Sequence, residues 1–237
     1  MMREQRLYRD GAVTALRALS ALDVNYARTH RAPTREAGWH IDTLVQPLPC
    51  EPAGDPVTGG PWETACRLVR DYQFAEPRIL RGIYDTRDPM PGRNMLLEGR
   101  FCGLRFDMGV RVTSVIDEAH GTGTAARRVW GWGYQTLQGH LEEGELNYEV
   151  VKDLHTGRVD FVITGYSRRA PIPDPLVRLG FLFFGRLTQR RFYRRSAQRL
   201  RGLLLAELRG VPPPVLETHP ADGSVVLAPS RIPLAPL

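Results

Sequence analysis

The spacing of apolar residues changes along the chain, and each change marks a different kind of element. Between residues 3 and 22, apolar residues recur at spacings of three and six among charged ones, which predicts a helix. The stretch 47–61 holds five prolines and three glycines and predicts a loop. An amphipathic helix of about three turns is predicted to begin at Pro61, with its apolar face formed by Trp62, Cys66, Val69 and Tyr72.

From residue 79 to residue 168 the apolar residues alternate, which predicts strands. The clearest runs are 110–116, 130–134, 146–150 and 159–163, and in the first of these Val110, Val112, Ser114 and Ile116 are expected to share one face. Turn signals at 107–109, 120–123, 142–144 and 155–157 separate these runs. Because the links are short, the strands should pair as an antiparallel meander.

After three prolines at 171, 173 and 175, a helical period returns over about residues 176–208. Its apolar stripe predicts a helix that lies on the sheet for most of its length. The stripe consists of Val177, Phe181, Phe184, Thr188, Phe192, Ser196, Leu200 and Leu203. From residue 211 onward the chain is rich in proline and has no period, so we expect it to be mostly disordered or loosely attached.

Together these elements predict an α+β fold, in which a curved antiparallel meander wraps around a long C-terminal helix. The 237 residues suit one domain, covering 23–209, with an N-terminal helical extension at 1–22 and a flexible proline-rich tail at 210–237. Where the sheet bends away from the helix, a concave apolar space can open, and such spaces are the default place for a ligand.

Composition narrows the setting of the protein. The longest apolar run, 179–184, is far too short to span a bilayer, and residues 1–10 lack the apolar segment of a secretory signal. Three widely spaced cysteines form neither a disulfide framework nor a zinc site, and the six histidines show no metal-ligand spacing. We therefore expect a cytoplasmic protein without a metal or cofactor.

Arginine dominates the charge of the chain. The net charge is +6, and Lys152 is the only lysine among 32 basic residues. The densest basic run comprises Arg186, Arg190, Arg191, Arg194, Arg195, Arg199 and Arg201. At helical spacing we favour the solvated side of a helix; phosphates of a membrane surface or of nucleic acid are the alternatives. Since no nucleic-acid docking motif is present, a peripheral membrane contact is the more open of the two.

Several catalytic and nucleotide-binding motifs are excluded. Residues 121–126 match G-x-G-x-x-A, but a strand follows them instead of a helix, so they predict a hairpin turn. The chain has no G-x-x-x-x-G-K-[ST], H-E-x-x-H or G-x-S-x-G motif. Established hydrolase, kinase, metalloprotease and dinucleotide-binding classes are thus disfavoured.

The segment 130–145, WGWGYQTLQGHLEEGE, is similar to an aromatic-glycine strand followed by Gly-Thr-Leu-x-Gly-His-x-x-x-Gly-Glu, as in the DUF1990 (UPF0548) family of uncharacterised proteins. Gln135 stands where glycine is expected, and Arg169 replaces a proline. The matching residues are Tyr134, Thr136, Leu137, Gly139, His140, Gly144 and Glu145, with Asn25, Tyr26, Arg111, Val112, Ser167, Arg168, Gln189, Arg190, Arg191 and Tyr193 elsewhere. The resemblance covers roughly residues 23–205. The resemblance implies a fold like that of the START-related helix-grip proteins, many of which hold lipids or other apolar molecules. It implies no particular activity.

His140 is the most suggestive polar residue, because carboxylates at Glu142, Glu143 and Glu145 lie close to it in sequence. A carboxylate beside an imidazole could make it a general base. We favour the simpler interpretation that His140 caps backbone groups of a glycine turn. Glu145 could equally pair with an arginine across the sheet.

Two further groups could face a ligand. Trp130, Trp132 and Tyr134 share one strand face and could line a cavity, with the Tyr134 hydroxyl as a polar handle; they could also simply be core. Ser167 and Arg168 could bind an anionic head group, although a strand-end salt bridge is the favoured interpretation.

The leading hypothesis is a protein that binds a small apolar or amphipathic molecule between the sheet and the C-terminal helix. One alternative is an enzyme with a His140/Glu145 acid–base pair, and another is an interaction module that docks acidic partners on the arginine helix. The candidate ligand-binding residues are Trp130, Trp132, Tyr134, His140, Glu145, Ser167 and Arg168. The oligomeric state is left open.

Overall fold

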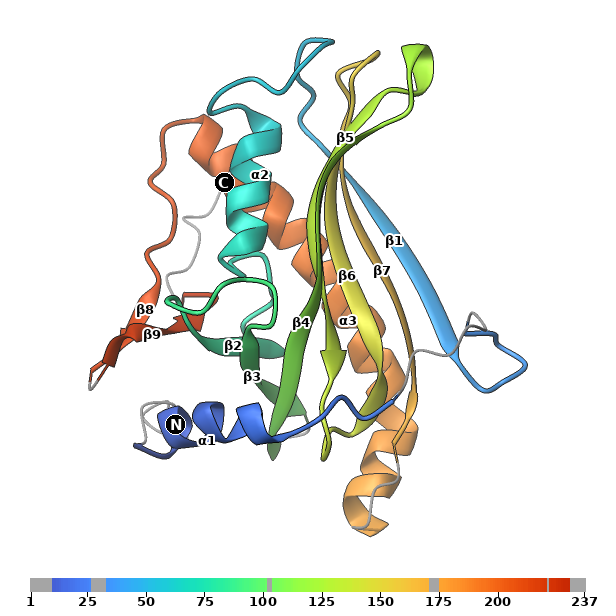
Figure 1. Cartoon of the computed structure of the whole chain (residues 1–237), viewed down its shortest axis with the longest axis vertical. Helices are drawn as coiled ribbons and strands as arrows, with labels where there is room; N and C mark the ends of the chain where they lie inside the picture. Colours follow the sequence, from blue (N-terminus) through green and yellow to red (C-terminus); the bar gives the residue numbers. More distant parts are fainter. Residues whose placement is uncertain (1–9, 27–32, 102–103, 171–174, 221, 231–237) are drawn as a thin grey trace.

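A computed structural model describes residues 10–26, 33–101, 104–170, 175–220 and 222–230. A single nine-stranded sheet curves around the long helix α3 (Pro175–Leu208), as Figure 1 shows. All neighbouring strands are antiparallel, in the order β1-β7-β6-β5-β4-β3-β2-β9-β8. The strands are β1 (His40–Leu48), β2 (Leu80–Asp85), β3 (Asn94–Phe101), β4 (Leu104–His120), β5 (Arg127–Thr136), β6 (Glu142–Asp153), β7 (Val159–Arg169), β8 (Glu217–His219) and β9 (Asp222–Ala228). The predicted α+β class, with its curved sheet and long C-terminal helix, is confirmed.

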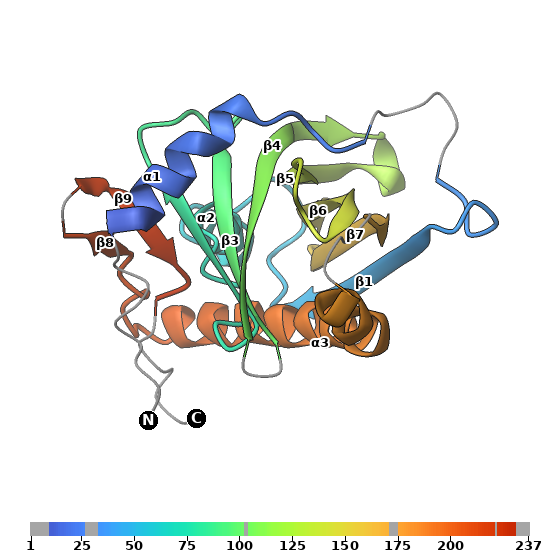
Figure 2. The same cartoon turned by 90° about the horizontal axis from the view of Figure 1, so that it is seen from below.

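The helices lie on both faces of the sheet. Seen from below (Figure 2), α3 lies on the concave face together with α2 (Pro61–Arg70), while α1 (Asp10–Ala18) crosses the opposite face. The predicted helix from Pro61 is present but ends at Arg70, so Tyr72 lies beyond it; of the helix predicted at 3–22, residues 10–18 are α-helical and 19–21 form a 3-10 turn, while residues 1–9 lie outside the described part. Of the apolar stripe on α3, the described members are Phe192, Ser196, Leu200 and Leu203, which are buried, and Thr188, which is partly buried.

The central strands follow the predicted alternation, but the turns predicted at 107–109 and 142–144 are wrong, because these residues lie within β4 and β6. Trp130, Trp132 and Tyr134 on β5 are paired with Val150, Tyr148 and Leu146 on β6, and all six side chains are buried. Residues 121–126 form the hairpin turn between β4 and β5, as their motif predicted.

A β-bulge in β4 corrects one prediction. Val112 pairs with Tyr134, but Ser114 pairs with Gly133, so the register shifts between them. Because directly paired residues share a sheet face, Ser114 lies on the face opposite to Val112. The expectation that residues 110, 112, 114 and 116 share one face is wrong.

Three strands, β1, β8 and β9, were not anticipated. β9 pairs with β2 and buries residues 225–228, and β8 pairs with β9, so the expected disordered tail is wrong over 217–219 and 222–228. The apolar run of β9 is short and flanked by Pro220 and Pro229, which favoured the loop interpretation. β1 pairs with β7 along its whole length. Its inner positions include His40 and Asp42, opposite Ser167 and Gly165, whereas Val45 on its outer side is 53% exposed.

At one end of the concave face, a buried ion pair fixes the loop before α2. Lys152 Nζ lies 2.7 Å from Glu51 Oε2, and both side chains are 0% exposed. Lys152 also donates to the Asp55 carbonyl, and Glu51 accepts the backbone N–H groups of Val57 and Trp62. Every polar group of the pair therefore has a partner, as a buried pair requires.

Candidate functional site

One half of the concave face is filled by aromatic rings of the protein itself. Tyr148 lies at the centre of this core: its ring centroid is 4.6 Å from that of Phe74 and 5.3 Å from that of Trp132. Tyr72, which adopts a φ of +55°, packs its fully buried ring against the same group. The cavity expected between the sheet and the helix is here occupied by side chains.

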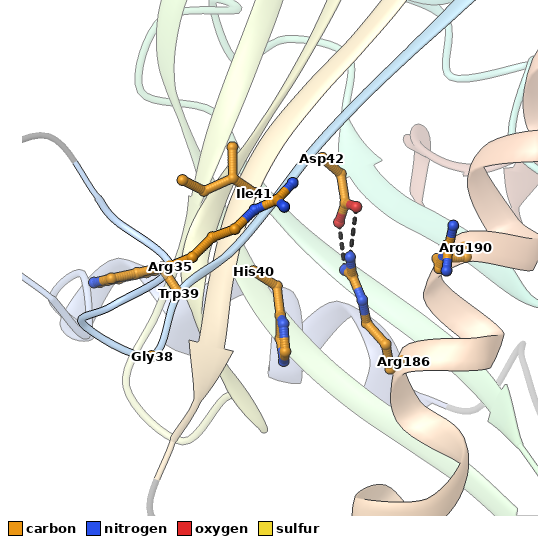
Figure 3. Close-up of a pocket in the computed structure, with 8 residues that line it drawn as sticks. All are labelled: Arg35, Gly38, Trp39, His40, Ile41, Asp42, Arg186 and Arg190. Carbon is orange, nitrogen blue, oxygen red and sulfur yellow. Dashed lines mark hydrogen bonds and ion pairs between the residues drawn. The ribbon is translucent and has the colours of Figure 1, made fainter.

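The other half opens into a pocket of about 460 Å³ between β1 and α3 (Figure 3). β1 and the turn before it form one wall, and two arginines one helical turn apart form the other. The lining residues are Arg35, Gly38, Trp39, His40, Ile41, Asp42, Arg186 and Arg190.

An ion pair joins the two walls of this pocket. The Arg186 guanidinium donates two hydrogen bonds to the two carboxylate oxygens of Asp42, as the dashed lines in Figure 3 show. Arg186 also donates to Gln189 Oε1 at 2.7 Å. The hydrogen bonds to Asp42 raise the pKa of Arg186. This bidentate pair positions β1 against the helix.

Behind the ion pair lies a carboxyl group that titrates near neutral pH. Gln189 Nε2 donates to Ser167 Oγ at 3.1 Å and to Glu142 Oε2 at 3.4 Å. Burial raises the pKa of Glu142 to about 7, although the nearby Arg186 charge acts in the opposite direction. Near neutrality this carboxyl group can therefore either give or take a proton.

Two buried phenols lie within electrostatic range of this carboxyl group. Burial raises the pKa of Tyr193 far above its ordinary value, and the negative charge of Glu142 adds to the effect. Tyr134 also has a pKa raised by burial, and its ring centroid lies 6.1 Å from that of Tyr148 in the filled half. A series of polar groups thus leads from the pocket to the aromatic core. We call it the polar track: Asp42, Arg186, Gln189, Ser167, Glu142, Tyr193 and Tyr134.

The pocket itself carries excess positive charge. Arg35 and Arg190 are exposed, and within the described ranges neither has an acidic partner. The one carboxylate in the lining, Asp42, is already compensated by Arg186. Guanidinium groups in this position are suited to a carboxylate, sulfonate or phosphate.

His140 lies in the turn between β5 and β6. Its side-chain Nδ1 accepts a hydrogen bond from the backbone N–H of Glu142 at 2.9 Å, and its backbone N–H donates to the Leu137 carbonyl at 3.1 Å. Burial lowers the pKa of His140 to about 4, so the imidazole is neutral at pH 7. These contacts correspond to the turn-capping role that the sequence favoured for His140.

The Glu145 side chain lies on the face of the sheet opposite to the concave face that holds α3. It accepts hydrogen bonds from Tyr166 at 2.9 Å, from Asn147 at 3.1 Å and from Tyr26 at 3.2 Å. Its bonding partners thus differ from those of His140. The hypothetical acid–base pair of Glu145 and His140 has no support in this geometry.

The other predicted residues divide between core, polar track and surface. Trp132 donates its indole N–H to the Val69 carbonyl, and Trp130 packs under Arg70. Ser167, like Tyr134, belongs to the polar track. Arg168 forms an ion pair with Glu143 and lies over the Trp39 ring, which agrees with the strand-end salt bridge.

Sequence reasoning missed Asp42, Glu142, Arg186 and Gln189 as a group. Gln189 entered only through the family resemblance, and Glu142 only as a neighbour of His140. A usable signal existed: with the period of two in β6, residues 142, 144, 146 and 148 share a face, which places a carboxylate on an otherwise apolar side.

The fold and site define an α+β protein in which a curved antiparallel sheet holds a long C-terminal helix, with a polar opening at one end. The family model "Domain of unknown function (DUF1990)" matches residues 21–199, and the chain belongs to this family. No curated protein matches the chain in sequence.

Three solved structures are similar in shape. Ara h 8.0201 is 10% identical, with 71% of this chain and 99% of that one covered and a TM-score of 0.40. A putative uncharacterised protein from Rhizobium leguminosarum is 11% identical, with coverages of 71% and 97% and a TM-score of 0.35. A hypothetical protein from Helicobacter pylori is 12% identical, with coverages of 75% and 97% and a TM-score of 0.34. Likeness at this level says nothing about a ligand.

Two further properties concern the described residues alone. Among them, no helix is both long and apolar enough to cross a membrane. The same residues contain no cluster of three or more histidine, cysteine, aspartate or glutamate side chains placed to hold a metal ion.

Proposed function

We propose that the protein binds a small amphipathic molecule with an anionic group in the pocket between β1 and α3. The observation that carries this proposal is a pocket of about 460 Å³ in which Arg35 and Arg190 have no acidic partner within the described chain. Trp39 and Ile41 are the apolar residues of the lining; they lie on the outer side of the sheet at its β1 edge, where the Trp39 ring packs on Tyr26 and Tyr166. The ligand therefore lies at the margin of the concave face, and the filled aromatic half supports the pocket.

The polar track gives the inner end of the pocket its chemistry. A ligand that separates Arg186 from Asp42 gains access to Gln189, Ser167 and Glu142. Because the pKa of Glu142 is about 7, its carboxyl group can donate a hydrogen bond when protonated and accept one when ionised. Uncharged polar groups such as hydroxyls would suit this end.

The test uses 1-anilinonaphthalene-8-sulfonate, an anionic amphipathic probe, in fluorescence titrations with the full chain. Arg190→Gln is expected to weaken binding about tenfold, because a charge-assisted hydrogen bond is lost. Arg201→Gln, an exposed arginine of α3 outside the pocket, is the matched control and should change affinity less than about twofold. Equal effects of both variants would show that the probe binds elsewhere and would refute the proposal that this pocket is the binding site.

A second candidate function is acid–base catalysis centred on Glu142. It is favoured by one observation, a carboxyl group with a pKa of about 7 beside the Ser167 hydroxyl and Gln189. In a substrate screen, any turnover should follow ionisation near pH 7 and be lost in Glu142→Gln, while probe affinity is retained. Turnover that persists in this variant would exclude Glu142 as the catalytic group.

A further inference from the structure

Five of the seven exposed positions of α3 between residues 187 and 201 are arginine. These exposed positions fall at helical spacings of three and four, so they form one continuous arc along the helix. They are Leu187, Arg190, Arg191, Arg194, Arg195, Gln198 and Arg201. We call this set the arginine face.

These arginines differ from others on the same helix. Arg186 is paired with Asp42, and Arg199 donates to the Gln73 carbonyl. Glu207, the single acidic residue of α3, is paired with Arg67. The five arginines of the arginine face have no acidic partner in the described parts of the chain, and like charges at spacings of four repel one another. A polyanionic surface would relieve this repulsion.

We infer that the arginine face docks the protein on an anionic lipid surface. Guanidinium groups bind phosphate with two parallel hydrogen bonds, and arginines close to an anionic membrane each strengthen attachment. Leu187 lies within the same arc and is 66% exposed, which gives the face an apolar side chain to bury among the head groups. A nucleic-acid backbone would use the arginines but would leave this leucine in water.

The arginine face and the pocket share a residue. Arg190 lines the pocket between β1 and α3 and also belongs to the exposed arc (Figure 3). A protein docked by this face therefore holds the pocket beside the lipid surface, where an amphipathic molecule could enter. The docking itself is independent of the proposed ligand, because four of the five arginines lie outside the pocket.

The test is flotation of the full chain with vesicles of phosphatidylcholine, with and without phosphatidylglycerol. Binding should require phosphatidylglycerol and weaken as salt rises, because exposed charges are screened beyond about 10 Å at 0.1 M salt. Arg191→Gln/Arg195→Gln, which leaves the pocket intact, should weaken binding on the order of 25-fold, about fivefold for each arginine. The matched control, Arg78→Gln/Arg127→Gln, removes the same charge from exposed sites outside α3 and should retain most of the binding.

Leu187→Asn separates membrane from nucleic acid. It should weaken vesicle binding and leave binding to a duplex oligonucleotide unchanged. Equal binding to neutral and anionic vesicles, or equal loss in the two arginine double variants, would overturn the proposal. Tight duplex binding without vesicle binding would also overturn it and assign the face to nucleic acid.

Discussion

Each end of the concave face contains an ion pair. One pair joins the loop before α2 to β6, the other joins β1 to α3, and their surroundings differ. Lys152–Glu51 is completely buried, and further backbone groups satisfy its remaining hydrogen bonds. Arg186–Asp42 is 32% and 19% exposed and borders the pocket. The first pair lies in a packed region that cannot rearrange without exposing a charge. The second is partly exposed and should open at lower cost, so the pair that fixes the fold and the pocket that we propose binds a ligand lie at opposite ends of one face.

The largest expected effect comes from breaking the buried pair. Lys152→Met leaves the Glu51 carboxylate buried without its cation, and the free energy of unfolding should fall by about 3–5 kcal/mol. Urea denaturation measures this loss. Lys152→Met/Glu51→Gln should recover part of it, because no unpaired charge remains. A loss below about 1 kcal/mol in the single variant would contradict the conclusion that the Lys152–Glu51 pair stabilises its end of the concave face.

The next largest effect concerns the other end of the concave face, where Glu142 should make the free energy of unfolding depend on pH. The pKa of Glu142 is about 7 in the folded protein against an ordinary 4.5, so the folded state binds the extra proton between these values. The stability contributed by the protonated group is present below about pH 4.5 and is lost as pH rises through 7. Relative to wild type, Glu142→Gln should therefore gain about 3 kcal/mol between acidic and alkaline pH.

Urea titrations of both proteins across pH 4.5–8.5 check this gain. Glu143→Gln, whose side chain is paired with Arg168 instead, is the neighbouring control and should show no such gain. His140, with its pKa lowered to about 4, contributes the opposite slope in wild type, because its unfolded form binds the extra proton up to about pH 6.5. The comparison of variant with wild type cancels that slope, and a flat difference would refute a buried Glu142.

The smallest expected effect is that of opening the exposed pair. Arg186→Met should reduce the free energy of unfolding by no more than about 1 kcal/mol, since partly exposed ion pairs contribute little. The same change removes a charge that lowers the pKa of Glu142, so the pH window of the previous experiment should move upward. A loss as large as that of Lys152→Met would mean that the two ends do not differ.

The sequence predicted the parts of the fold in which burial follows a simple period. β5, β6 and β7 and the helices α2 and α3 belong to this group. β1 was missed because its pattern is inverted: Asp42 lies on the inner side, and Val45 on the outer. The bulge between Val112 and Ser114 also has no signature in the alternation, because one extra residue changes the face without changing the composition.

The candidate site was harder to predict for a different reason. Tyr134 and Ser167 were named from the strand pattern and the resemblance, but the groups that join them come from three other places. Asp42 lies on the unpredicted β1, Gln189 on the distant helix α3 and Glu142 at the start of β6. Asp42 reaches the site through the β1–β7 pairing and Gln189 through the position of α3 against β6 and β7, and no local spacing encodes either arrangement.

The pairing of residue 82 with residue 228 has a consequence for synthesis on the ribosome. β2 is translated before β3 to β7 and α3, whereas its neighbour β9 follows all of them. During that interval β2 has an unpaired edge, and such edges attract other extended chains. Closure of the sheet at this end must therefore come after most of the domain has left the ribosome, and a chain that stops before residue 222 would carry an open edge from the start.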